Sequence, residues 1–263
     1  MKRNYRNRFG RLLALMLVLV MVSAMVLPMG AMAKTNEPEW EDNVLKKDPL
    51  KSMAKREKII SVTFLDTTED APRRPYFLGQ GRPKNVLGWV EWEGGYANIY
   101  IAAEGGINAK YCFEMFRGCN ELVEINFNGA FHTDEAKTMQ SMFRSCSSLE
   151  ELDLSGFNTS NVTNMSAMFY ACDELEELDL TSFDTGKVTN MASMFGGCTE
   201  LERVDVTSFD TSRVTSMEVM FRWCYNLDDY DFSGWDVSRV KKYNKFMDDG
   251  MKINGRDWEK FFD

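Results

Sequence analysis

The sequence contains one histidine, His132, among 263 residues. Histidine clusters for zinc and the HExxH pattern are therefore absent, and a serine-histidine-aspartate triad would depend on this single side chain. The glycine pairs form neither a GxGxxG fingerprint nor a P-loop. Paired carboxylates could still hydrolyse glycosides, but among 40 acidic residues their proximity carries almost no information. We therefore expect no enzyme, no metal or cofactor and no catalytic residue, and interpret His132 as an ordinary loop residue.

Long apolar runs are also scarce. The run of 16 residues from Leu12 to Leu27 is shorter than the roughly 20 residues that a membrane-spanning helix needs. Residues 1–33 hold five basic and no acidic residues and end in Ala31-Met32-Ala33, which fits the small-x-small rule for cleavage. These features predict a secretory signal peptide at 1–33, with an uncleaved membrane anchor as the alternative. Because no LPxTG-like tail or second apolar segment follows, we expect no stable transmembrane anchor after signal cleavage.

Basic residues are the minority in the remainder of the chain. Without residues 1–33, 26 basic residues stand against 40 acidic ones, and this negative charge argues against nucleic acid as a partner. Residues 34–56 are highly charged and poor in apolar side chains, which indicates a linker. We predict a small N-terminal β cap with three strands at 57–108. The evidence is the alternation of apolar and polar residues in ISVTF, VLGWVEW and YANIYIAA, with glycine pairs that mark turns.

No proline occurs after residue 83, and a strict repeat occupies most of this proline-free part. Cys146, Cys172, Cys198 and Cys224 lie 26 residues apart, each preceded by a Met-Phe pair and followed by leucine three residues later. A fixed period of this length indicates stacked units. Apolar residues six and eight positions after each cysteine alternate as in a strand, whereas those before it recur every three or four residues as on a helix.

These patterns predict an α/β solenoid, a leucine-rich-repeat-like stack of about five strand-helix coils at 109–250. A weaker first copy surrounds Cys119, and a decayed last copy has Gly250 in the place of the cysteine. Bulky aromatic residues follow, so we expect a short aromatic C-terminal cap at 251–263 that covers the last coil.

The repeat MFxxCxxLxxLDLSxFxTSxVTxM resembles the leucine-rich repeat of BspA-like bacterial surface proteins over roughly residues 109–250. Residues 59–106 also resemble the segment that precedes the repeats in that family. The resemblance implies a secreted or surface-displayed binding protein of low-GC Gram-positive bacteria, mollicutes or related commensals. Adhesion to host or bacterial partners is the role usually proposed for such proteins.

The six cysteines of an exported chain suggest disulfides, but five of them occupy one repeat position and Cys112 occupies a methionine position of the repeat. If residues 112–119 are helical, Cys112 and Cys119 lie roughly 10 Å apart, too far for a disulfide. We expect small buried thiols, although a disulfide between equivalent cysteines of neighbouring coils stays possible.

Acidic residues alternate with the buried leucines of each predicted strand and should point away from the core. Stacking would align Asp153, Asp179, Asp205 and Asp231 about 5 Å apart, with Asn126 continuing the row. In one hypothesis this row recruits cations or a basic partner, and in the other each Asp is solvated or hydrogen-bonds the neighbouring turn. The ligand-binding candidates are Glu151, Asp153, Glu177, Asp179, Asp205, Asp229 and Asp231.

The sequence therefore predicts a secreted or cell-surface-associated recognition protein. Its repeat face would bind an extracellular protein or glycan, with adhesion as one use of such binding. The alternative is a secreted inhibitor or accessory protein of an extracellular enzyme, which would act by occlusion. The turn segments NTSNVT, DTGKVT, DTSRVT and DVSRVK have the composition of capping and turn sequences, so we assign them a structural role.

Overall fold

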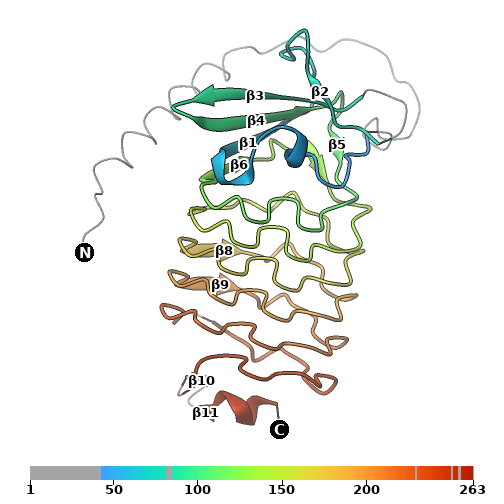
Figure 1. Ribbon diagram of the computed structural model, residues 1–263. Helices are drawn as coiled ribbons and strands as arrows, with labels where there is room; N and C mark the ends of the chain where they lie inside the picture. The colour runs from blue at the N-terminus through green and yellow to red at the C-terminus, as the bar shows by residue number, and fades with distance from the viewer. Residues whose placement is uncertain (1–42, 81–84, 229, 250, 254–255, 263) are drawn as a thin grey trace. The chain divides into compact units, whose positions relative to one another are not determined.

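The computed structural model describes residues 43–80, 85–228, 230–249, 251–253 and 256–262 (Figure 1). The expected signal peptide at 1–33 lies outside the described residues. Residues Pro38–Asp263 form one compact unit, and everything below concerns its described part. None of the helices in that part combines the length and apolar character needed to cross a membrane.

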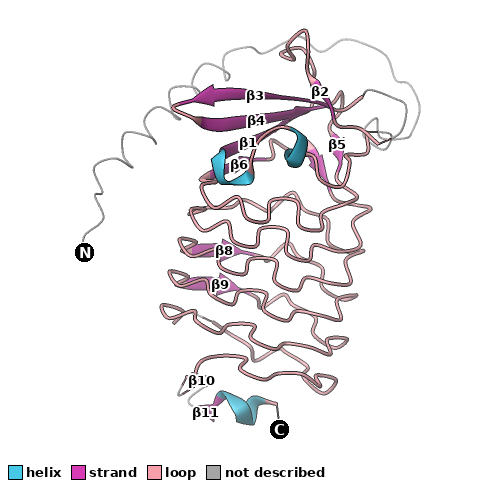
Figure 2. Cartoon of the chain, in the orientation of Figure 1, coloured by secondary structure: helices cyan, strands magenta, loops and turns pink. Residues whose placement is uncertain are grey.

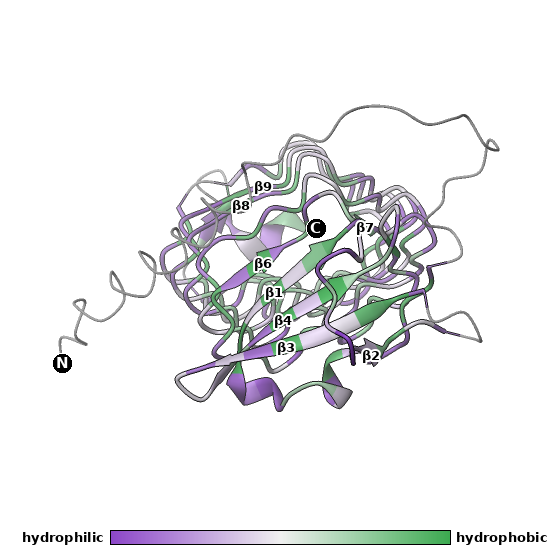
Figure 3. Cartoon of the chain, turned by 90° about the horizontal axis from the view of Figure 1, so that it is seen from above, coloured by the Kyte–Doolittle hydropathy of each residue, from purple (hydrophilic) through white to green (hydrophobic). Residues whose placement is uncertain are grey.

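A five-stranded sheet with strand order β2-β3-β4-β1-β6 precedes the repeats. β1 runs parallel to β4 and β6, whereas β3 is antiparallel to β4 and β2. Figure 3 shows β6, β1, β4 and β3 side by side. The strands are β1 (Ile59–Leu65), β2 (Tyr76–Phe77), β3 (Leu87–Glu93), β4 (Tyr96–Ala102) and β6 (Glu124–Asn126). The three strands expected from alternation are therefore present as β1, β3 and β4.

Local sequence explains the hairpin between β3 and β4. Gly94 and Gly95 connect the strands with φ angles of 58° and 85°, the left-handed conformation that two-residue hairpin loops require. The stretch before β1 forms two short 3-10 helices, η2 (Leu50–Ser52) and η3 (Arg56–Lys58). It also contributes Leu45, Leu50 and Met53 to the core, although its composition suggests a linker.

The repeats stack in parallel with a constant register. β8 (Glu177–Asp179) pairs with β9 (Arg203–Asp205), and β5 (Ile107–Asn108) pairs with β7 (Phe131–His132). A column of single parallel bridges joins the equivalent residues Thr138, Asn164, Asn190, Ser216 and Lys242. Each repeat is therefore hydrogen-bonded to the next at several points along its course. Figure 1 shows the stacked repeats.

The expected α/β solenoid of strand-helix coils is wrong. The described residues contain no α-helix, only short 3-10 helices outside the repeats (Figure 2). Their strands fall into one five-stranded sheet and separate pairs rather than a continuous closed solenoid sheet.

The segment expected to be helical, around Met165 to Cys172, is a chain of tight turns. Ala167 and Ala171 have φ angles of 54° and 57°, which no right-handed helix contains. Their amides donate to Ala192 and Gly196 in the next repeat, at 2.8 and 2.9 Å, and not to carbonyls within their own segment. The spacing of Met, Phe and Cys thus reflects which side chains point inward from successive turns.

The core is built from the same side chains in every repeat. Phe143 stacks on Phe169 with 5.6 Å between ring centroids, and Phe169 on Phe195 with 5.7 Å. The column extends at both ends to Phe116 and Phe221. After the last repeat come β10 (Lys252–Ile253), β11 (Arg256–Asp257) and η4 (Trp258–Phe261). Trp258 and Phe262 pack edge-on or tilted against Phe246, so aromatic rings cover the final repeat.

Arg56 closes the opposite end of the stack. Its Nη1 atom donates to the carbonyls of Met115 and Arg117, both at 2.9 Å. The equivalent carbonyls one repeat later, those of Met142 and Arg144, accept from backbone amides of the preceding repeat. Arg56 therefore supplies the donors that a preceding repeat would have supplied.

Candidate functional site

The short strands of the repeats present one side to the core and the other to solvent. Leu178 and Val204 are buried between repeats, while their neighbours on either side face outward. We call this outward side the strand face. Its described residues in the repeats are Glu124, Asn126, Glu151, Asp153, Glu177, Asp179, Arg203, Asp205 and Asp231. Of the candidates taken from the sequence, only Asp229 lies outside the described residues.

Stacking aligns the aspartates of the strand face. The β8–β9 pairing sets Asp179 directly opposite Asp205, and Glu177 opposite Arg203. Asp153, Asp179 and Asp231 are exposed, whereas Asp205 is half-buried. Arg203 forms an ion pair with Glu177, which partly neutralises the glutamate column.

Each aspartate of this column also shapes the turn that follows it. Asp153 accepts a hydrogen bond from the amide of Ser155 at 2.9 Å, and Asp179 from that of Thr181 at 2.9 Å. Asp205 and Asp231 bind the amides two residues later in the same way. Such turns are a recurrent use of Asp and Asn.

These hydrogen bonds also lower the pKa of three of the carboxylates. The amide and hydroxyl of Ser155 lower the pKa of Asp153, and the hydroxyl and amide of Thr181 lower that of Asp179. The pKa of Asp231 is lowered by Ser233 for the same reason. The column is thus both a structural device and a fixed row of negative charge. A hollow of about 110 Å³ lies between its first two members, lined by Leu152, Asp153, Leu154, Ser155, Asp179, Thr181 and Ser182.

The strand face continues onto the N-terminal sheet, which the sequence did not reveal. Register places Asn126 opposite Thr63, Thr63 opposite Tyr100, and Tyr100 opposite Trp89. The Tyr100 and Trp89 rings stack at 5.3 Å. The polar column of the repeats therefore runs into an aromatic pair. Alternation in YANIYIAA already placed Tyr100 on the polar side, but the order of strands decides which column it joins.

The pKa values of two groups in this part of the face are raised. Burial raises the pKa of Tyr100 to about 12, and the neighbouring Glu91 adds to this shift. The Glu91 carboxylate accepts a hydrogen bond from the Tyr100 hydroxyl at 3.3 Å. Burial also raises the pKa of Glu124. Tyr100 is a hydroxyl donor beside the carboxylate of Glu91, which accepts from it.

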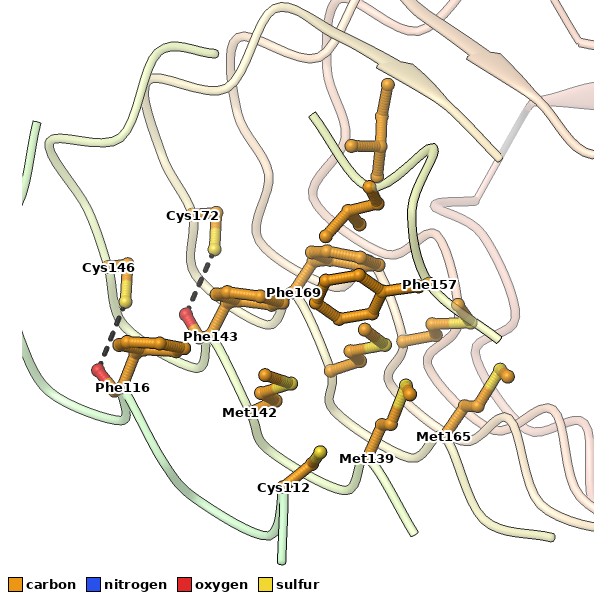
Figure 4. Close-up of a cluster of buried hydrophobic side chains, with 14 of the residues drawn as sticks. Cys112, Phe116, Met139, Met142, Phe143, Cys146, Phe157, Met165, Phe169 and Cys172 are labelled. Atoms are coloured by element: carbon orange, nitrogen blue, oxygen red, sulfur yellow. Dashed lines mark hydrogen bonds between the residues drawn. The ribbon is translucent and has the colours of Figure 1, made fainter. Parts of the chain in front are cut away.

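The cysteines lie away from this face, inside the core. All six are buried and free. The thiol of Cys172 donates to the carbonyl of Phe143 at 3.2 Å, and Cys146 makes the same contact with Phe116 (Figure 4). Burial raises the pKa of each thiol. The cysteines therefore have a structural role.

His132 lies in strand β7 and is half-buried, so its interpretation as a loop residue is wrong. The strand pairing of Phe131 and His132 with Ile107 and Asn108 explains the difference. Among the described residues, no group of three His, Cys, Asp or Glu is placed to hold a metal ion.

Comparison with known proteins identifies a family. The protein family described as "Mycoplasma protein of unknown function, DUF285" matches residues 110–202 and residues 169–261, which together span most of the chain after the N-terminal sheet. No curated protein matches the chain, and no solved structure does.

Proposed function

The chain belongs to the DUF285 family, and we propose that it is a recognition protein. It binds an extracellular protein or glycan through the strand face of its repeats. It is secreted or cell-surface-associated, as the N-terminal features of the sequence indicate. The repeat motif further supports a relationship to BspA-like surface proteins, with adhesion as one use of the binding.

One observation carries this proposal: an exposed row of carboxylates is held in register by the backbone. The turn bonds at Asp153 and Asp179 fix the side chains before any ligand arrives. Preorganisation of this kind reduces the entropy lost on binding. A row of fixed negative charges also attracts positively charged surfaces and accelerates their association. A basic protein surface or a glycan bearing amino groups has the complementary chemistry.

A binding screen tests the proposal. The purified protein is applied to immobilised matrix proteins, mucin, cell-wall glycans and bacterial surface extracts at low and at physiological salt. We expect saturable binding to at least one class, weakened by salt because exposed charges are screened within about 8–10 Å. Stoichiometric inhibition of an extracellular enzyme without binding to any of these surfaces would favour the inhibitor alternative and contradict the proposal.

A further inference from the structure

The outer edge of β3 is largely unpaired within the described part of the chain. β4 pairs with all seven residues of β3, from Leu87 to Glu93, on one side. On the other side β2 pairs only with Leu87 and Gly88. The remaining stretch, residues 89–93, extends beyond β2 and forms an edge of the five-stranded sheet (Figures 1 and 3). We call this stretch the β3 edge.

The phase of the strand shows which backbone groups the β3 edge offers. The carbonyl of Val86 accepts from the amide of Leu78 at 2.8 Å, so Val86 directs its backbone groups toward the β2 side. In an antiparallel strand successive residues direct these groups to opposite sides. Val90 and Trp92 therefore direct their amides and carbonyls outward, while Trp89, Glu91 and Glu93 face β4.

The β3 edge combines exposed aromatic rings with acidic side chains. Natural edges are often shielded by charged side chains, above all lysine, or by proline or a bulge. Here Trp92 is 59% exposed, and the neighbouring Phe77 and Tyr76 of β2 are 49% and 43% exposed. Exposed aromatic residues next to an open strand edge are typical of an interaction surface. Glu91 and Glu93 are exposed beside them.

We propose that the β3 edge binds an extended, basic polypeptide segment as an additional strand. The backbone of the segment would pair with Val90 and Trp92. Because residues of a strand alternate between faces, lysine or arginine at every second position would meet Glu91 and Glu93, and apolar residues between them would meet Trp92. A second copy of the chain fits less well, since antiparallel pairing of two β3 edges would bring the glutamates of both copies together on one face.

The β3 edge lies apart from the aspartate column of the repeats, although Glu91 borders the extension of the strand face at Tyr100. The candidate residues of the aspartate column lie on repeats whose strands follow β6, whereas β3 is separated from β6 by β4 and β1. The two sites can therefore be tested independently.

The experiment measures binding of a fluorescent decapeptide of alternating lysine and valine to the purified protein, by fluorescence anisotropy. A decapeptide of alternating glutamate and valine is the matched probe. The variant Val90→Pro removes one outward amide, and proline is tolerated on the open side of an edge strand. Val90→Thr keeps the amide and serves as the control. We expect the basic peptide to bind at least tenfold more tightly than the acidic one, and Val90→Pro to weaken it at least tenfold while Val90→Thr changes it less than twofold.

Amide hydrogen exchange in the unaltered protein gives a second readout that requires no folded variant. The amide of Trp92 should exchange rapidly in the free protein and slowly with the basic peptide. Trp92→Pro replaces Val90→Pro if the latter loses its near-native circular dichroism. Replacing Asp153, Asp179, Asp205 and Asp231 by Asn should leave the peptide-dependent slowing of Trp92 exchange unchanged.

Three results would overturn the proposal. The first is equal binding by Val90→Pro and Val90→Thr together with no slowing of Trp92 exchange. The second is loss of peptide binding in the four-fold Asp→Asn variant, which would place the peptide on the strand face. The third is a concentration-dependent dimer that Val90→Pro abolishes, because a second copy would then occupy the edge.

Discussion

At the scale of single residues, the repeat is held together by small polar contacts inside an apolar core. The buried cysteines Cys146, Cys172, Cys198 and Cys224 each donate their thiol to the carbonyl of a phenylalanine in the preceding repeat. Alanine would lack both the volume and the donor, which explains why the repeat has cysteine at this position. The aspartates likewise have two roles, because each stabilises a turn and carries a negative charge.

We predict that Cys172→Ala lowers the free energy of unfolding by about 1–2 kcal/mol, because it leaves a small cavity and removes a hydrogen bond from the Phe143 carbonyl. Urea denaturation monitored by circular dichroism measures the change. Ser147→Ala is the control, since its exposed hydroxyl makes one 3.3 Å bond and its loss should cost less than about 0.5 kcal/mol. An unchanged midpoint for Cys172→Ala would show that the thiol neither packs nor donates as described.

At the scale of elements, the sequence identifies the period and the buried positions but not the backbone between them. Met165, Met168, Phe169 and Cys172 are all buried as predicted, yet they belong to turns and not to a helix. Helical spacing and this chain of turns bury the same positions, so periodicity could not separate them. The amides of Ala167 and Phe169 have acceptors in the next repeat, and a single repeat considered alone gives no sign of such contacts.

The candidate site was also predictable only in part. Alternation around Leu178 identified Glu177 and Asp179 as outward-facing, and the register of β8 and β9 aligns them with the next repeat. The extension through Thr63 and Tyr100 could not be predicted, because it depends on β1 lying between β4 and β6. Strands far apart in sequence meet there, and no local pattern records that order.

Arg56 caps the N-terminal end of the repeats, so its replacement should destabilise the protein. Arg56→Met should lower the free energy of unfolding by about 1–3 kcal/mol, since two carbonyls lose a charged donor. Arg74→Met is the matched control, because Arg74 is exposed on the surface and should change stability by less than about 0.5 kcal/mol. Thermal and urea unfolding of both variants would compare them. Equal stability of the two variants would contradict the capping role of Arg56.

At the scale of the whole molecule, the apolar interior holds titratable thiols that must stay protonated. Burial raises the pKa of Cys112 and Cys224 to about 12 and that of Cys119 to about 11. In the unfolded chain the same thiols titrate near 8.5. Between these values the folded state binds more protons than the unfolded state, so stability falls as pH rises.

We therefore predict that the stabilising contribution of the buried thiols is fully present below about pH 8.5 and is lost progressively toward pH 11–12. Urea denaturation at pH 7, 9 and 10 would show a falling midpoint. Cys172→Ala, which has one thiol fewer, should show a shallower decline. A midpoint that stays constant across this range would contradict the burial of the thiols.

The central claim is that the fixed carboxylate row of the strand face recognises the partner. The most direct test compares the unaltered protein with the four-fold variant Asp153→Asn, Asp179→Asn, Asp205→Asn and Asp231→Asn on mucin, matrix proteins and cell-wall glycans. Asn126 already makes the same turn with the amide of Asn128 at 3.1 Å, so asparagine should preserve the fold while removing the charge. We expect an unchanged unfolding midpoint and at least a tenfold loss of the salt-sensitive binding. Full binding by a folded four-fold variant would contradict it.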